Sequence, residues 1–164
     1  MKLKSKKPKK ESKGNSWKRN FKLEDTIKKN LCAIIDEAYK DDSLENRRKY
    51  KNFSIYIFPD KTCTSVGGTY YPDKKVVRIY NFDEGPLAIT GTTLHELSHH
   101  IDCMQHGKSG HGKPFYGIYK RLMYTAFDMG QVSPKKLREY TLESIYREKN
   151  KVLAIIDEYL AMHE

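Results

Sequence analysis

The chain has 164 residues, a formal net charge of +10 and 38% hydrophobic residues, and this length suits one domain with a sizeable core. No apolar run is long enough to cross a bilayer, and the basic first residues are not followed by the apolar segment of a secretory signal. Cys32, Cys63 and Cys103 form neither an even set nor a Cys-x-x-Cys pair, which is typical of a reducing compartment. We therefore expect a cytoplasmic protein that neither spans a membrane nor depends on disulfides.

The positive charge is concentrated in residues 1–20. This segment holds eight Lys, Arg19 and a single acidic residue, Glu11, so its net charge is +8 and residues 21–164 keep +2. It is too poor in apolar residues to order itself, and we predict a disordered basic tail. Such a tail can hold nucleic acid through the phosphates without sequence preference, and Trp17 could stack on an unpaired base. A solubilising arm is the alternative function for the same composition.

The first half of the remaining chain is predicted to form a helix and then a small sheet. Residues 21–40 repeat apolar side chains at helical spacing, whereas residues 46–49 are polar and are expected to be exposed. Three segments rich in β-formers follow, at residues 53–58, 64–71 and 76–82. The last two are joined by a turn, so we expect a hairpin that leads directly into the next helix.

Three helices are predicted after the sheet, at residues 86–105, 114–130 and 133–159. A proline stands at or next to the start of each, where its fixed φ and missing N–H are tolerated. Glycines predict a loop over residues 106–113. The fold class is therefore α+β: an N-terminal helix, a three-stranded sheet with a hairpin, a central helix and C-terminal helices.

The helix over residues 86–105 carries a metal-binding pattern. His95 and His99 are four residues apart, so both imidazoles lie on one helix face and can reach the same ion. Apolar residues on the opposite stripe, such as Leu97, would anchor the helix in a core. Glu96 is not placed to be a ligand. Its carboxylate can instead hydrogen-bond a zinc-bound water, accept a proton as the water attacks a peptide carbonyl, and pass it to the leaving amine.

A hydrolytic zinc site takes three protein ligands and keeps a fourth position for water, so one more ligand is needed. His111 is the favoured candidate, because glycines flank it in a loop that can fold back. His106 is the rival, since it continues the same helix face. However, His106 lies two turns from His99 and could reach the ion only if the helix unwound early.

Several other groups have open roles. His100 points away from the two motif histidines, and we expect it at the surface or behind a ligand. Asp102 could orient a ligand histidine or pair with a surface charge, and one of the tyrosines could stabilise an oxyanion. In a gluzincin-like alternative, Glu139 or Glu143 of the last helix would replace His111 as the third ligand.

Two segments match the pattern of a known family. Residues 95–99 are His-Glu-Leu-Ser-His, and residues 111–115 are His-Gly-Lys-Pro-Phe, which has the form His-Gly-x-x-Phe. Together with the preceding helix, strand and hairpin, they resemble the SprT-like metalloproteases, the family that includes the Spartan proteases. The resemblance covers about residues 21–130.

The resemblance implies a fold, a cofactor and an activity. It implies a small zincin-like metalloprotease domain over this range, with Zn²⁺ held by His95, His99 and His111 and with Glu96 as the catalytic base. Many SprT-like proteins also carry a C-terminal zinc ribbon with paired cysteines. Here residues 131–164 contain no cysteine and are predicted to form a C-terminal helix packed on the domain.

The sequence therefore predicts a zinc-dependent endopeptidase that acts on unfolded or nucleic-acid-associated protein. An extended substrate could pair with an open edge of the strand that precedes the metal helix. A second class of protein fits the same residues: a non-catalytic nucleic-acid-binding protein in which the tail binds and zinc braces the fold. Glu96 separates the two, because only the endopeptidase depends on its carboxylate.

Overall fold

The computed structural model describes residues 20–58 and 67–164. Its elements in chain order are α1 (Phe21–Ala38), α2 (Leu44–Lys51), β1 (Ser54–Ile57), β2 (Gly68–Tyr71), β3 (Val76–Ile79), a 3-10 turn η1 (Phe82–Glu84), α3 (Pro86–His106), α4 (Lys113–Asp128), α5 (Pro134–Glu143) and α6 (Lys149–Met162). Four predicted features lie outside the described residues: the tail over residues 1–19, Trp17, Cys63 and the start of the second strand at residues 64–66. The α+β class is confirmed. None of the described helices is both long and apolar enough to cross a membrane.

The sheet is mixed, and β3 is its central strand. The strand order is β1-β3-β2, with β1 parallel and β2 antiparallel to β3. Residues 72–75 form the turn between β2 and β3, so the predicted hairpin is confirmed. The expectation that the strand before the metal helix has an open edge is wrong, because β3 is paired on both sides. Among the described strands, β1 and β2 are the edges.

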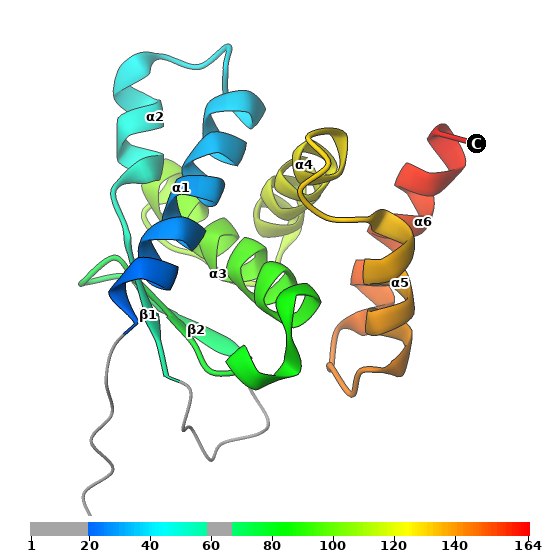
Figure 1. Cartoon of the computed structure of the whole chain (residues 1–164). Helices are drawn as coiled ribbons and strands as arrows, with labels where there is room; N and C mark the ends of the chain where they lie inside the picture. Colours follow the sequence, from blue (N-terminus) through cyan, green and yellow to red (C-terminus); the bar gives the residue numbers. More distant parts are fainter. Residues whose placement is uncertain (1–19, 59–66) are drawn as a thin grey trace, which may run out of the picture.

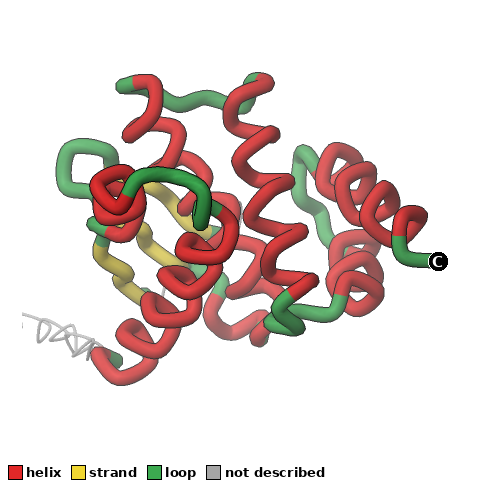
Figure 2. Tube along the Cα trace, turned by 90° about the horizontal axis from the view of Figure 1, so that it is seen from above, coloured by secondary structure: helices red, strands yellow, loops and turns green. Residues whose placement is uncertain are grey.

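α3 is the central element of the fold. It contacts β2 and β3 of the sheet and also α4 and α5. Its predicted anchoring stripe is Leu94, Leu97, Ile101 and Met104: the first three are fully buried, and Met104 is partly buried against the core. Burial of each fully buried side chain stabilises the fold by about 1.5–3 kcal/mol. The strands lie toward one end of the molecule and the last two helices toward the other (Figure 1, Figure 2). α3 is thus held by packing on both sides.

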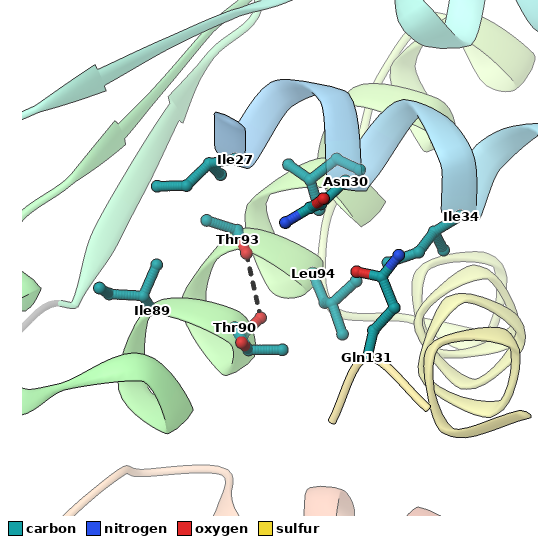
Figure 3. Close-up of a pocket in the computed structure, with 9 residues that line it drawn as sticks. Ile27, Asn30, Ile34, Ile89, Thr90, Thr93, Leu94 and Gln131 are labelled. Carbon is teal, nitrogen blue, oxygen red and sulfur yellow. Dashed lines mark hydrogen bonds between the residues drawn. The ribbon is translucent and has the colours of Figure 1, made fainter. Parts of the chain in front are cut away.

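A small cavity of about 100 Å³ lies between α1 and α3 (Figure 3). Its lining residues are Ile27, Asn30, Leu31, Ile34, Ile89, Thr90, Thr93, Leu94 and Gln131. The hydroxyl of Thr93 donates a hydrogen bond to the backbone oxygen of Thr90 at 3.1 Å, within the wall of the cavity. Because the lining set contains no His, Cys, Asp or Glu, this cavity offers no metal site.

The C-terminal region is two helices rather than the single predicted helix over residues 133–159. α5 ends at Glu143 and α6 begins at Lys149. Ser144 is extended, with ψ 155°, and its hydroxyl donates to the backbone oxygen of Thr141 at 2.8 Å. A serine that bonds the nearby backbone in this way competes with helix continuation. We call residues 144–148 the α5–α6 connector.

The two C-terminal helices are fastened to different parts of the fold. The Tyr140 hydroxyl of α5 donates to the carboxylate of Glu84, just before α3, at 2.6 Å. The Tyr159 hydroxyl of α6 donates to Asp128 at the end of α4 at 2.7 Å. Apolar side chains of both helices, such as Ile156, belong to the common core. α5 and α6 therefore pack on the common core.

α2 was not predicted as a helix, because its sequence is almost entirely polar. Its start is stabilised by Ser43, whose hydroxyl accepts a hydrogen bond from the backbone N–H of Asn46 at 3.1 Å. Most of its side chains are exposed, as expected, but Tyr50 is buried. A short helix with one buried residue leaves no periodic apolar pattern in the sequence.

His100 is fully buried, so its predicted place at the surface is wrong. Its Nε2 lies 3.1 Å from the backbone oxygen of Lys49, and its Nδ1 lies 2.7 Å from the Tyr70 hydroxyl. A carbonyl oxygen can only accept, so Nε2 carries the proton and Nδ1 accepts from Tyr70. The ring thereby joins α3 to α2 and β2. Burial lowers the pKa of His100 to about 4.

We expect His100 to make the fold acid-sensitive. Its pKa is lower in the folded chain than in the unfolded chain, so its contribution to stability is complete above pH 6.5 and falls by about 1.4 kcal/mol per pH unit as the pH drops toward 4. In urea unfolding of the metal-free protein between pH 7 and pH 5, His100→Gln should therefore show a shallower loss of stability than wild type. Tyr70→Phe is the control, because it removes a bond to His100 but keeps the titrating ring; equal slopes for His100→Gln and wild type would contradict the prediction.

Candidate metal centre

Three histidines meet at one point beside α3. His95 and His99 project from α3, and His111 comes from the loop before α4. Nε2 of His111 lies 3.2 Å from Nε2 of His95 and 3.1 Å from Nε2 of His99. Within the described part of the chain, this is the one group of three or more potential ligand side chains that could hold a metal ion.

The spacing of the three nitrogens fits a tetrahedral ion. Zinc binds imidazole nitrogen at about 2.0–2.1 Å, so two nitrogens of one tetrahedral site are separated by about 3.3–3.4 Å. The two Nε2 separations that involve His111, 3.1 and 3.2 Å, are close to this value, and the three ligand atoms all lie within 4.8 Å of one another. Three imidazole ligands with a fourth position open is also the donor set of hydrolytic zinc sites. The residues present therefore fit a zinc ion.

The loop that brings His111 back is shaped by a glycine and a buried phenylalanine. Gly107 ends α3 with φ 77°, in the left-handed region where a side chain would be strained, and its N–H donates to the backbone oxygen of Cys103 at 2.8 Å. Phe115, fully buried in the first turn of α4, packs its ring 4.4 Å from the ring of His99 and 5.0 Å from that of His111. The chain thus reverses directly after α3 and is pinned beside the histidines.

Each ligand imidazole also has a partner on its outer nitrogen. The Nδ1 contacts are His95 to the Tyr146 hydroxyl at 3.1 Å, His99 to the Ser109 hydroxyl at 2.8 Å, and His111 to the Glu148 carboxylate at 3.2 Å. A carboxylate only accepts, so Nδ1 of His111 is the donor in its contact with Glu148 and its Nε2 faces the other two histidines. Partners of this kind fix the orientation and tautomer of a metal ligand.

The two α3 histidines are held neutral. Burial, followed by the neighbouring His99 and His111, lowers the pKa of His95 to about 3. Burial, followed by His111, lowers the pKa of His99 to about 4. Because a metal binds only the unprotonated imidazole, both side chains are ready to ligate at neutral pH.

Glu96 lies next to the three histidines without joining their group. Its Oε1 is 3.9 Å from Nε2 of His95, and 8% of its surface is exposed. Burial raises the pKa of Glu96 to about 7, although a hydrogen bond from the backbone of Tyr70 in β2 opposes this shift. The carboxylate thus lies beside the candidate metal position.

β2 approaches α3 closely at a glycine. A Cβ atom on Gly68 would lie 2.5 Å from Cγ2 of Thr92, 2.6 Å from the backbone oxygen of Arg78 and 3.3 Å from Cγ of Glu96. The Arg78 oxygen belongs to the backbone of β3 and is not free to move aside, so a side chain at Gly68 would push β2 away from β3 as well as from Thr92 of α3. The absence of a side chain therefore lets the edge strand lie against the candidate site, which explains the glycine at the start of this strand.

The rival ligands lie elsewhere. His106 pairs through Nδ1 with Oδ1 of the buried Asp102 at 2.7 Å, so Asp102 holds His106 and makes no hydrogen bond to a motif histidine. Glu139 and Glu143 are exposed on α5 and are not members of the three-histidine group. The structure thus brings together His111 with the motif pair, and leaves His106 and both glutamates apart.

Sequence analysis missed three contributors to the site: Ser109, Tyr146 and Glu148. Ser109 gave no signal beyond its place between glycines. The apolar spacing of residues 133–159 continues through the α5–α6 connector and hides the break that exposes Tyr146 and Glu148. Ser144 was the one local hint, because serine disfavours the middle of a helix.

Comparisons with protein-family models, curated proteins and solved structures found no match to this chain. The resemblance to SprT-like metalloproteases therefore stays a prediction that rests on residues 95–99 and 111–115. The argument for a metal centre rests on the geometry of the three histidines.

The three-histidine group predicts the response of zinc binding to substitution. The full-length chain should bind one zinc ion, measured by metal analysis after dialysis and by competition with a chromophoric chelator. His111→Ala removes a ligand and should weaken binding by more than the roughly 10–100-fold that loss of an outer partner costs. His106→Ala is the matched control and should bind as wild type does; retained zinc in His111→Ala would instead favour the gluzincin-like alternative.

Proposed function

We propose that this protein is a zinc-dependent endopeptidase of the SprT-like type. The single observation that carries the proposal is the meeting of three imidazoles with one buried carboxylate beside them. Nε2 of His111 lies 3.1 Å from Nε2 of His99 and 3.2 Å from Nε2 of His95. Three ligands and an adjacent carboxylate are the minimal equipment for metal-assisted hydrolysis of a peptide bond. The His-Glu-x-x-His motif of residues 95–99 alone would fit many classes of zinc hydrolase. The His-Gly-x-x-Phe segment of residues 111–115 favours the SprT-like type.

The residues divide the chemistry among them. A zinc ion held by His95, His99 and His111 would polarise the substrate carbonyl and make water more acidic. Glu96 takes the proton of the attacking water on its carboxylate and returns it to the leaving amine. Its Oε1 lies 3.9 Å from Nε2 of His95, so the carboxylate is beside the ligand set and remains free for this transfer.

We propose that an extended substrate pairs with the outer edge of β2. The backbone oxygen of Gly67 accepts a hydrogen bond from the N–H of Tyr80 at 2.8 Å, on the β3 side. Bonding direction alternates along an antiparallel pair, so the backbone groups of Gly68 and Tyr70 face away from β3. The N–H of Tyr70 is already used by Glu96. An extended peptide could pair with the remaining groups and bring a carbonyl to the metal.

The non-catalytic alternative, in which zinc only braces the fold, fits the number of ligands less well. A structural zinc site is closed by four protein ligands, whereas the described ligand group has three members. The basic tail nevertheless supports nucleic acid as an associated partner, since residues 1–20 hold +8 of the net +10 charge. We therefore propose nucleic-acid-associated protein as one class of substrate for the endopeptidase.

Glu96→Gln tests the proposed chemistry. The amide keeps the size of the side chain but cannot accept a proton, so cleavage of an unfolded, fluorescently labelled protein should fall on the order of 10²–10⁴-fold. Zinc affinity should stay at the wild-type value, because Glu96 is not a ligand. Glu143→Gln makes the same chemical change at an exposed position on α5 and should leave both the cleavage rate and the zinc affinity unchanged. Full activity in zinc-loaded Glu96→Gln would rule out this mechanism.

Deletion of residues 1–19 tests the proposed partner. This cut keeps Asn20, whose side chain accepts a hydrogen bond from the backbone N–H of Leu23 at 3.1 Å and caps α1. We expect single-stranded DNA binding, measured by fluorescence anisotropy, to fall strongly and to lose most of its salt dependence. Zinc content and cleavage of a protein free of nucleic acid should not change. Undiminished DNA affinity would show that the folded part provides the nucleic-acid surface.

A further inference from the structure

We infer that the α5–α6 connector is part of the metal centre: Tyr146 and Glu148 position two of the three ligand imidazoles from outside. The inference rests on the proposed metal site and deepens it. Tyr146 lies 51 residues beyond His95, which it contacts, and Glu148 lies 37 residues beyond His111. They would act as positioning residues, because they reach the ion through His95 and His111 rather than directly.

Glu148 is held by the backbone in a way that leaves its carboxylate available. It is the capping residue directly before α6, and its backbone oxygen accepts from the N–H groups of Lys151 and Val152 at 3.0 and 3.3 Å. Its side chain makes no capping bond to the helix. Instead, Oε2 lies 3.2 Å from Nδ1 of His111, and Oε1 lies 3.7 Å from Nζ of Lys151. One oxygen thus faces the ligand and the other faces a cation.

The connector is itself fixed. Nζ of Lys149 donates to the backbone oxygens of Leu142 and Ser144, both at 3.3 Å. The N–H of Lys149 donates to the backbone oxygen of Tyr146 at 3.2 Å. These bonds satisfy carbonyls that the end of α5 leaves without a helical partner. The connector therefore has a defined conformation in which Tyr146 and Glu148 both face the histidines.

Tyr146 makes the corresponding contact on the other side of the centre. Its hydroxyl lies 3.1 Å from Nδ1 of His95, and the two rings meet edge to face at 5.9 Å. When Nε2 of His95 is directed to the ion, Nδ1 carries the proton and donates to the Tyr146 oxygen. The Tyr146 hydroxyl is then free to donate to Glu148, whose Oε2 lies 3.5 Å away. The two positioning residues form one chain of contacts.

A purely structural role for these contacts is disfavoured by the other bonds of the same helices. α5 is joined to Glu84 through Tyr140, and α6 is joined to Asp128 through Tyr159. Ile145, which directly precedes Tyr146 in the chain, is 94% exposed and adds no packing. The connector thus buries little apolar surface of its own. Its polar contacts to the histidines are therefore better explained by a role in orienting the metal ligands than by a role in docking the helices.

The consequence is a specific effect on metal affinity. Partners on the outer nitrogen of a ligand histidine fix its tautomer and raise its basicity, and their loss costs about 10–100-fold in metal affinity. Glu148 contributes an ionised acceptor, which is the stronger kind. We therefore expect Glu148→Ala to have the larger effect and Tyr146→Phe, which keeps the ring but removes the hydroxyl, to have the smaller one.

The test is zinc affinity of full-length variants, measured at pH 7.5 by competition with a chromophoric chelator. Glu148→Ala should weaken binding by about 10–100-fold, and Glu148→Gln should recover most of it, because the amide oxygen still accepts from Nδ1. Thermal unfolding of the metal-free proteins should give similar midpoints, which separates loss of the contact from loss of the fold. The visible spectrum of the Co²⁺-loaded protein should also change in Glu148→Ala, since it reports ligand geometry.

Glu143→Ala is the matched control, an exposed carboxylate five residues earlier, and should bind zinc as wild type does. Zinc affinity within about threefold of wild type for both Glu148→Ala and Tyr146→Phe would overturn the inference while leaving the three-histidine site intact. A weakening of zinc binding of the same size in Glu143→Ala would also overturn it, because loss of a carboxylate that does not contact the histidines would then have the same effect. Failure of the wild-type chain to bind zinc would overturn the proposed function together with this inference.

Discussion

The candidate site depends on three imidazole nitrogens that lie close together with their lone pairs converging. Nε2 of His111 is 3.1–3.2 Å from the Nε2 atoms of both α3 histidines, and its Nδ1 proton is directed to Glu148. Converging lone pairs repel one another unless a cation or a shared proton lies between them. Burial, which lowers the pKa of His95 to about 3 and that of His99 to about 4, disfavours the proton. A metal ion is the cation that this arrangement favours.

Rigid neighbours keep the nitrogens in place. The apolar stripe of α3 is fully buried and fixes the helix that carries two of the ligands. Gly107 reverses the chain with φ 77°, and the buried ring of Phe115 packs against His99 and His111. Gly68 lets the edge strand lie against Glu96. Each of these residues serves the site through packing or backbone conformation, so the site is preorganised by the same contacts that stabilise the fold.

The parts of the site that the sequence predicts are the local ones. His95 and His99 share a face because helix geometry requires it, and His111 could be chosen because its loop is short and rich in glycine. The sequence could not place His100, since its partners lie on α2 and β2, far away in the chain. Nor could it reveal the break near Ile145, because the apolar spacing continues through it. Strand order was equally hidden, as it depends on pairing between segments rather than on the pattern within one.

The break between α5 and α6 ties the C-terminal residues to the chemistry. Tyr140 joins α5 to Glu84, just before α3, and Tyr159 joins α6 to the end of α4. The helices on both sides of the connector are therefore held in place. A continuous helix over this region could not turn Glu148 toward His111, because its backbone would continue away from the fold. The break after α5 therefore lets Glu148 contact His111, and the unit that we propose to bind the metal extends from α1 through α6 rather than ending at α4.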